Sequence, residues 1–338
     1  MNYRVPGSNR LMQLLDQLDQ AQQRSKPLSV TLATVKKFSE DQSTGLASMI
    51  AFWAFFSIFP LLLVAVTILD LALPAGDRNA VLTRVAGMFP VLDVKSVRSL
   101  TGSWWPLLVG SITALWGGIS VVGTMQNAFN SVWEVPQHER PGKVQQIVRS
   151  LVVLATIGVG LVLTTFVSSF VTSSANGVNL GAAGRVGGYV FAIVLDVFLV
   201  TATFRILTKR DVTIRDVLPG GLLAGVSFFV LQELSAFIIS RHLKSAQGTY
   251  GHFATVITIL WWFYLQSLIT LFGAQLNVVL KDRLYPRSLV KGTKTEADHR
   301  VLQAYAAERA YDPDEQVIAR VPDSARGGES ETNSGEAD

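Results

Sequence analysis

Long runs without a charged side chain are the dominant pattern of this sequence. A helix at the surface of a soluble protein keeps one polar face, so uninterrupted apolar runs indicate segments that meet hydrocarbon instead of water. Two blocks, about 186–207 and 217–240, are apolar apart from Asp196 and Arg205 in the first and Glu233 in the second. Four further runs contain no Asp, Glu, Lys or Arg at all: residues 42–69, 99–133, 150–184 and 245–280.

These runs predict an all-α, polytopic membrane protein with six transmembrane helices. About 20 predominantly apolar residues cross the hydrocarbon core as a helix, and each block is long enough to do so. A transmembrane β-barrel is disfavoured, because its strands alternate between apolar and polar positions over about 10 residues. We place the six spans at about 46–70, 106–128, 148–170, 186–207, 217–239 and 254–279.

Polar segments flank the predicted transmembrane domain, which covers residues 46–280. Residues 1–45 form a cytoplasmic N-terminal segment, in which residues 28–38 are amphipathic and predict a helix on the inner membrane surface. No cleavable signal peptide is visible before the first apolar run. Residues 281–338 form a polar cytoplasmic tail, and its composition predicts disorder after about residue 295.

The Lys and Arg residues near the predicted helix ends indicate the orientation. Cytoplasmic loops of membrane proteins are enriched in these residues. If the N-terminus is cytoplasmic, the inner flanks hold 16 of them and the outer flanks hold 7. This bias predicts that both termini lie in the cytoplasm, as an even number of spans requires if either one does.

The net charge of +4 hides an uneven distribution. Residues 296–338 carry 11 of the 25 acidic side chains and 4 of the 29 basic ones, which leaves the rest of the chain at +11. A basic collar at the cytoplasmic surface attracts anionic lipid headgroups with about 1 kcal/mol per cation. We therefore expect membrane lipids, and not nucleic acid, as partners of this charge, and a homo-oligomer is left open.

Ionisable side chains inside the predicted spans are the first candidates for a functional site. A charged group at mid-bilayer costs about 2.5–3.5 kcal/mol on insertion scales. Asp196 lies near the centre of the fourth span, and Tyr189 and Thr203, seven residues to either side, share its helix face. Glu233 lies in the fifth span. The functional interpretation is an inward-facing acidic site for a cation, a proton or a substrate amine, and the structural one is a protonated carboxyl that bonds a neighbouring helix.

Uncharged polar residues form two further groups. Gln126, Asn127 and Asn130 cluster at the inner end of the second span, and Gln266 and Asn277 lie on one face of the sixth. Such stripes line a cavity in some proteins and join helices in others. For the Gly221-x-x-x-Gly225 pattern of the fifth span, close helix packing is the favoured interpretation.

The sequence lacks the residue patterns that several kinds of catalytic and metal-binding sites require. The chain has no cysteine, and its four histidines are scattered without the spacing of a metal site. It contains neither a phosphate-binding loop nor a Gly-x-Ser-x-Gly nucleophile turn. We therefore expect no enzyme activity, no metal and no cofactor.

Several motifs resemble the YihY/virulence factor BrkB family of bacterial inner-membrane proteins, formerly labelled ribonuclease BN. The likeness covers roughly residues 28–285. Its motifs are Phe52-Trp-Ala-Phe-Phe-Ser-Ile-Phe-Pro, Gln126-Asn-Ala-Phe-Asn-Ser-Val-Trp-Glu-Val, Leu218-Pro-Gly-Gly, Tyr250-Gly-His-Phe and Leu271-Phe-Gly-Ala-Gln-Leu-Asn. The family pattern leads us to expect an acidic residue where Gln275 stands and a proline near Leu207 and Thr208, so an ion-binding role for position 275 finds no support here.

The resemblance implies a six-helix protein of the bacterial cytoplasmic (inner) membrane whose activity is poorly defined. The first hypothesis is a transporter or an envelope lipid exporter with a polar intramembrane site. The alternative is a non-catalytic membrane scaffold or assembly protein, in which the polar stripes only pack helices. A ribonuclease finds no support in these residues, because a metal-dependent nuclease needs a cluster of ligands in a soluble domain.

Overall fold

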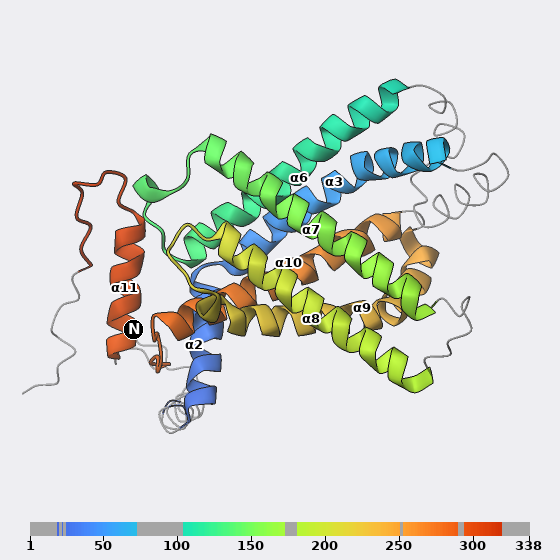
Figure 1. The fold of residues 1–338 in the computed structure, drawn as a ribbon. Helices are drawn as coiled ribbons and strands as arrows, with labels where there is room; N and C mark the ends of the chain where they lie inside the picture. The colour runs from blue at the N-terminus through green and yellow to red at the C-terminus, as the bar shows by residue number, and fades with distance from the viewer. Residues whose placement is uncertain are drawn as a thin grey trace, which may run out of the picture.

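The described part of the chain is a bundle of long helices without strands (Figure 1). The computed structural model describes residues 19, 22, 25–72, 104–172, 181–250, 253–289 and 294–319. Six long helices form the bundle: α3 (Ser43–Ala72), α6 (Trp104–Val132), α7 (Lys143–Thr172), α8 (Gly181–Leu207), α9 (Ile214–Tyr250) and α10 (Phe253–Lys281).

The prediction of six transmembrane helices is confirmed by length and composition. Each predicted span falls within one of the six long helices, and all six are long and apolar enough to cross a membrane. The helices continue beyond the predicted spans, most of all α9, which ends at Tyr250 where residue 239 was expected. The residues of this extension are polar, so a prediction from apolar runs alone ends the helix too early.

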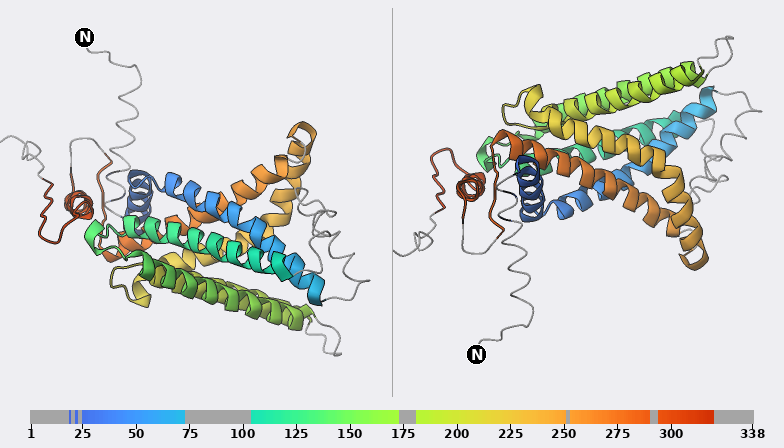
Figure 2. Two further views of the ribbon diagram at one scale, coloured as in Figure 1. Left: turned by 90° about the horizontal axis from the view of Figure 1, so that it is seen from above. Right: turned by 90° about the horizontal axis from the view of Figure 1, so that it is seen from below.

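Two shorter helices lie across one end of the bundle. Helix α2 (Lys26–Glu40) runs crosswise to the long helices, and α11 (Glu296–Glu308) lies farther out at the same end (Figures 1 and 2). We call this end the α11 end. From there the axes of the long helices spread apart toward the opposite end, as both views of Figure 2 show.

Packing is tightest at the α11 end. Phe129, Phe204, Leu207, Val217 and Leu271 are fully buried there and belong to one apolar core. Toward the opposite end the described side chains are less covered by protein: none is buried in residues 186–200 of α8, 226–232 of α9 or 256–266 of α10.

Glycines allow this close packing. A Cβ at Gly225 would lie 2.7 Å from the Cα of Val197, and a Cβ at Gly220 would collide with the backbone carbonyl of Gly273. Helix α9 therefore crosses α8 and α10 at a distance that only glycine permits. The packing interpretation of the Gly221-x-x-x-Gly225 pattern is confirmed, because Gly221 also fits directly against Thr201.

The prediction of disorder after about residue 295 is wrong for α11. Thr295 and Asp298 form a capping box at its start, and Ala297 and Val301 are buried. Composition misled the prediction, because this helix has only a small apolar face, which includes Val301, and is also held by polar contacts with distant segments, described below. The rest of the predicted disordered tail, from residue 320, lies outside the described residues, as do residues 1–18.

Candidate functional site at the α11 end

Asp196, the strongest sequence candidate, lies near the middle of α8, in the stretch of residues 186–200 where no side chain is buried. Its side chain is half-buried, and among the described residues it makes no hydrogen bond and no ion pair. Thr203 is buried, whereas Tyr189 is half-exposed and packs edge-on against Phe229 with ring centroids 5.8 Å apart. No polar contact joins Asp196 to Gln266 within the described part of the chain, and the side chain of Glu233 lies outside it.

Asn277 connects two helices. Its Oδ1 accepts a hydrogen bond from the backbone N–H of Gly220 at 2.6 Å, and its Nδ2 donates to the carbonyl of Val217 at 3.1 Å. Both backbone groups lie near the start of α9, on either side of Pro219. Asn277 thus fixes α9 to α10, which supports the packing interpretation for this residue.

The cluster at the inner end of the second span joins α6 to α7. The side-chain amide of Gln126 donates to the carbonyl of Gln146 at 2.9 Å and to the hydroxyl of Ser150 at 3.0 Å. Asn127 is exposed and accepts a hydrogen bond from the side chain of Gln146 at 3.2 Å. Asn130 is buried beside them.

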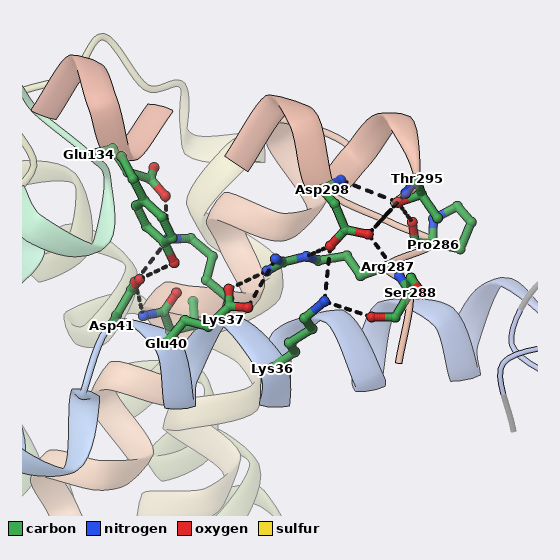
Figure 3. Close-up of polar contacts among 12 residues, drawn as sticks. Lys36, Lys37, Glu40, Asp41, Glu134, Pro286, Arg287, Ser288, Thr295 and Asp298 are labelled. Atoms are coloured by element: carbon green, nitrogen blue, oxygen red, sulfur yellow. Dashed lines mark hydrogen bonds and ion pairs between the residues drawn. The ribbon is translucent and has the colours of Figure 1, made fainter. Parts of the chain in front are cut away.

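A buried charge cluster, which sequence reasoning missed, lies where α2, α3, α6, α10 and α11 meet (Figure 3). Its centre is Lys37, whose ammonium group lies 2.8 Å from a carboxylate oxygen of Asp41 and also pairs with Glu134. The three side chains are 0%, 4% and 3% exposed, respectively. We call these three residues the buried triad.

The backbone places Glu134 in the triad. The N–H of Glu134 bonds the carbonyl of Ser131, and the N–H of Val135 bonds that of Asn130, which closes α6 in a Schellman motif. Glu134 occupies the position that usually holds glycine, with φ of 45°. A non-glycine residue in this conformation costs roughly 1 kcal/mol, so the chain holds this carboxyl inward against a local preference.

Neutral groups complete the surroundings of Asp41. The amide of Gln275 donates to Asp41 Oδ2 at 2.6 Å and to the Ser43 hydroxyl at 3.0 Å, and the Tyr305 hydroxyl donates to Asp41 Oδ1. The ammonium of Lys37 also lies 5.2 Å from the centre of the Tyr305 ring. Gln275 therefore has a structural role: its amide is a donor to Asp41, which a carboxylate at this position would repel.

A second network fastens α11 to the bundle (Figure 3). Arg287 is nearly buried and bonds Glu40 at 2.7 and 3.1 Å and Asp298 at 3.0 Å. Asp298 also accepts from the Lys36 ammonium at 3.0 Å and from the backbone N–H of Ser288 at 2.9 Å. At the other end of α11, Glu308 accepts from Arg140 and from Ser131, both at 2.7 Å.

Burial and pairing shift the pKa values of these groups. Burial lowers the pKa of Lys37, but the carboxylates of Glu134 and Asp41 outweigh it, so the net pKa is raised and the lysine stays charged. Burial raises the pKa of Glu134 to about 7 although Lys37 opposes the shift. For Asp298, hydrogen bonds from Ser288, Lys36 and Thr295 outweigh burial and hold its pKa well below the usual range.

A cavity of about 520 Å³ lies beside the triad, between the end of α2 and α11. Asp41, Ser131 and Tyr305 line it, together with Glu40, Glu308 and apolar residues of the segment after α11. Within the described residues, no group of three or more His, Cys, Asp or Glu side chains is arranged to hold a metal ion.

Signals for the missed residues were present but weak. In the sequence, Asp41 and Glu134 only mark the ends of charge-free runs. Lys37 is one of the basic residues on the inner flanks that are expected to face lipid, although its burial keeps it from lipid. Glu134 also stands in a motif that carries the family resemblance. Their convergence depends on the three-dimensional meeting of distant helix ends, which no spacing in the sequence reveals.

Comparison with known proteins gives a family match over most of the chain. The sequence profile described as Virulence factor BrkB matches residues 34–298. A Bacillus subtilis protein named ribonuclease-like protein YfkH is 24% identical over 73% of this chain and 93% of its own length. A UPF0761 membrane protein of Pseudomonas paraeruginosa is 25% identical over 74% of this chain, and one of a Janthinobacterium species is 29% identical over 53%.

The matches differ in how much of each relative they include. The chain spans 62% of the Pseudomonas relative and 41% of the Janthinobacterium relative. No solved structure matches the chain significantly.

Proposed function

The chain belongs to the virulence factor BrkB family of membrane proteins, and from this premise we propose that it is a transporter of the bacterial cytoplasmic membrane. The transported species is an envelope lipid or an ionic solute, and Asp196 binds its cationic part or a coupling proton. The observation that carries the proposal is the half-buried carboxyl of Asp196, which has no polar partner among the described residues.

In this proposal the α11 end faces the cytoplasm. The excess of Lys and Arg on the flanks assigned to this side, 16 against 7, supports that orientation. Helices α2 and α11 both lie at this end, which is consistent with termini on one side of the membrane (Figure 1).

The energetic argument concerns the position of Asp196. A carboxyl group within a transmembrane helix is costly and is retained where it faces a partner, a cavity or a ligand. Asn277 and Gln126, by contrast, have their amide groups bonded to neighbouring helices. Asp196 lacks such a bond in the described structure and lies in a stretch of α8 where no side chain is buried. A ligand, a coupling ion or a proton supplies the partner that the protein does not.

Reconstitution into liposomes tests the proposal. Purified protein is incorporated into vesicles that contain a pH-sensitive dye and fluorescent lipids, and movement of protons, ions and labelled lipids is followed separately. We expect movement of at least one species, reduced to background by Asp196→Asn. The matched control is Asp211→Asn, because Asp211 is an exposed carboxyl in the connection between α8 and α9.

The outcomes separate the alternatives. Transport that Asp196→Asn leaves unchanged removes this residue from the mechanism. Silent vesicles, together with a stoichiometric partner recovered by co-purification in mild detergent, favour the scaffold hypothesis. The name of the Bacillus relative suggests a third assay: RNA cleavage that follows the protein through chromatography would overturn our inference that the chain is not an enzyme.

A further inference from the structure

We infer that the buried triad of Lys37, Asp41 and Glu134 is a proton-binding site, and that the proton it holds keeps the α11 end of the bundle closed. The inference adds a regulatory site to the proposed function. Its link to transport rests on that function, but the proton site itself does not.

The first argument is a count of charge. Two carboxylates share one ammonium group, and all three side chains are almost fully buried. When all are ionised, the triad carries one uncompensated negative charge on side chains that are at most 4% exposed. Uncompensated buried charge is strongly unfavourable, and carboxyl groups in such a position take up a proton instead.

The surrounding charged groups do not supply the missing positive charge. Asp282 at the end of α10 adds a negative charge near Glu134 and is itself paired with Arg210 at 2.6 Å. Lys281 lies 3.4 Å from Asp216 and packs over the Trp133 ring. Among the other described neighbours, Glu40 is paired with Arg287, and Gln275 and Tyr305 are neutral donors to Asp41. Glu308 and Arg309 also line the adjacent cavity: Glu308 is paired with Arg140, and no ion pair joins Arg309 to Asp41 or Glu134 in the described structure.

The hydrogen bonds indicate which carboxyl takes the proton. Asp41 accepts bonds from Lys37, Gln275 and Tyr305, all of which stabilise its charged form. Glu134 accepts one bond, from Lys37, among the described residues. Glu134 is therefore the easier group to neutralise, and burial raises its pKa to about 7, within reach of cytoplasmic pH.

The structure also indicates a route and a direction. The cavity of about 520 Å³ is lined by Asp41 and Tyr305, so water within it can deliver a proton to the triad. Because the closed structure raises the proton affinity of Glu134, proton binding favours closure, and proton loss favours an opening that hydrates the carboxylate. The opening separates α2 from the end of α6, the two segments that the Lys37–Glu134 pair joins.

Infrared difference spectroscopy between pH 6 and pH 8 tests the site on the full-length protein in lipid. We expect a band from a protonated carboxylic acid at pH 6 that is lost at pH 8. Glu134→Gln should remove the band, and Asp211→Asn, at an exposed carboxyl outside the triad and outside the contacts of α11, should leave it. A spectrum without the band, or a band that survives Glu134→Gln, overturns the inference.

Two further measurements keep the test decisive. If Glu134→Gln fails to fold, Glu134→Gly replaces it, because glycine accepts the φ of 45° at this position. Hydrogen exchange of α2, corrected for the intrinsic effect of pH, should be faster at pH 8 than at pH 6 in the wild type and equally slow at both in Glu134→Gln. Exchange that does not depend on pH in the wild type contradicts the gating role, whether or not the vesicles transport anything.

Discussion

The α11 end and the opposite half of the bundle use polar side chains in different ways. At the α11 end, carboxylates, ammonium groups and amides bind one another across helices, and large apolar residues are fully buried around them. Toward the opposite end, the helix axes spread apart (Figure 2). Asp196, near the middle of α8, has no polar partner among the described residues. An ionisable group within a transmembrane helix that lacks a protein partner is a candidate functional site, whereas the bonded groups of the α11 end hold helices together.

The largest loss of stability should come from removing the cation of the buried triad. Lys37→Met keeps the length of the side chain but leaves two buried carboxylates without their counterion, so we expect a loss of about 3–5 kcal/mol in the free energy of unfolding. The measurement is unfolding in mild detergent followed by tryptophan fluorescence. Lys209→Met, at an exposed position of the same end, is the control. Equal stability of the two variants would contradict the assignment of Lys37 as a structural cation.

Alanine substitutions of two glycines compare the packing of the two regions directly. A Cβ at Gly220 collides with the Gly273 carbonyl and the Asn277 amide, whereas one at Gly187 meets nothing within 4 Å. Gly220→Ala should therefore destabilise the protein by up to about 3 kcal/mol through overpacking. Gly187→Ala should be neutral or slightly stabilising, because alanine favours the helix. Thermal unfolding of both variants measures the difference, and a reversed order would show that the α11 end is not the tighter region.

Substitutions of two amide side chains on α10 compare a polar group that is hydrogen-bonded with one that is not. Asn277→Leu leaves the N–H of Gly220 and the carbonyl of Val217 without their partner, and we expect a loss of about 2 kcal/mol. Gln266→Leu removes an amide with no hydrogen bond in the described structure, so its effect on unfolding should be small. If Gln266 lies on the transport path, the vesicle assay should reverse the order of the two variants. Transport should then fall in Gln266→Leu by more than any loss of folded protein explains.

The smallest expected effect is a pH dependence confined to the α11 end. The pKa of Glu134 is about 7 in the folded protein, above the ordinary value of 4.5 that applies after unfolding. The folded state therefore binds more protons between these values, and stability falls as the pH rises through this window, by up to about 2 kcal/mol. The decline should be present in the wild type and reduced in Glu134→Gln when unfolding is compared at pH 5 and pH 8. The opposite slope would contradict the raised pKa.

The transmembrane architecture was predictable from the sequence because it depends on one-dimensional properties. Long apolar runs, four of them free of charged side chains, locate the six helices, since hydrocarbon disfavours charged groups whatever the tertiary arrangement. The glycine pattern of α9 also predicted close packing, because small residues four positions apart lie on one helix face and let another helix approach closely. The helix ends were less predictable, since α9 continues into polar residues as far as Tyr250.

The charge cluster was not predictable, because it joins residues that are distant in sequence. Lys37 and Glu134 come from different helices, and each alone has the properties of an ordinary boundary charge. Helix α11 was missed for a related reason: it is too polar and too short to register as an apolar run, and Arg287 and Lys36 hold it through Asp298. The role of Asp196 stays a prediction, since the structure gives its surroundings but no ligand.

The most direct test of the contrast between the two regions is the labelling of single cysteines in intact cells. The chain has no native cysteine, so each introduced thiol reports only its own site. Asp196→Cys lies in the loosely packed half, and Ala274→Cys replaces a residue that is 1% exposed near the α11 end. With a membrane-impermeant maleimide applied from outside, the account predicts that Cys at position 196 reacts and Cys at position 274 does not. Protection of position 196 together with labelling of position 274 would contradict it.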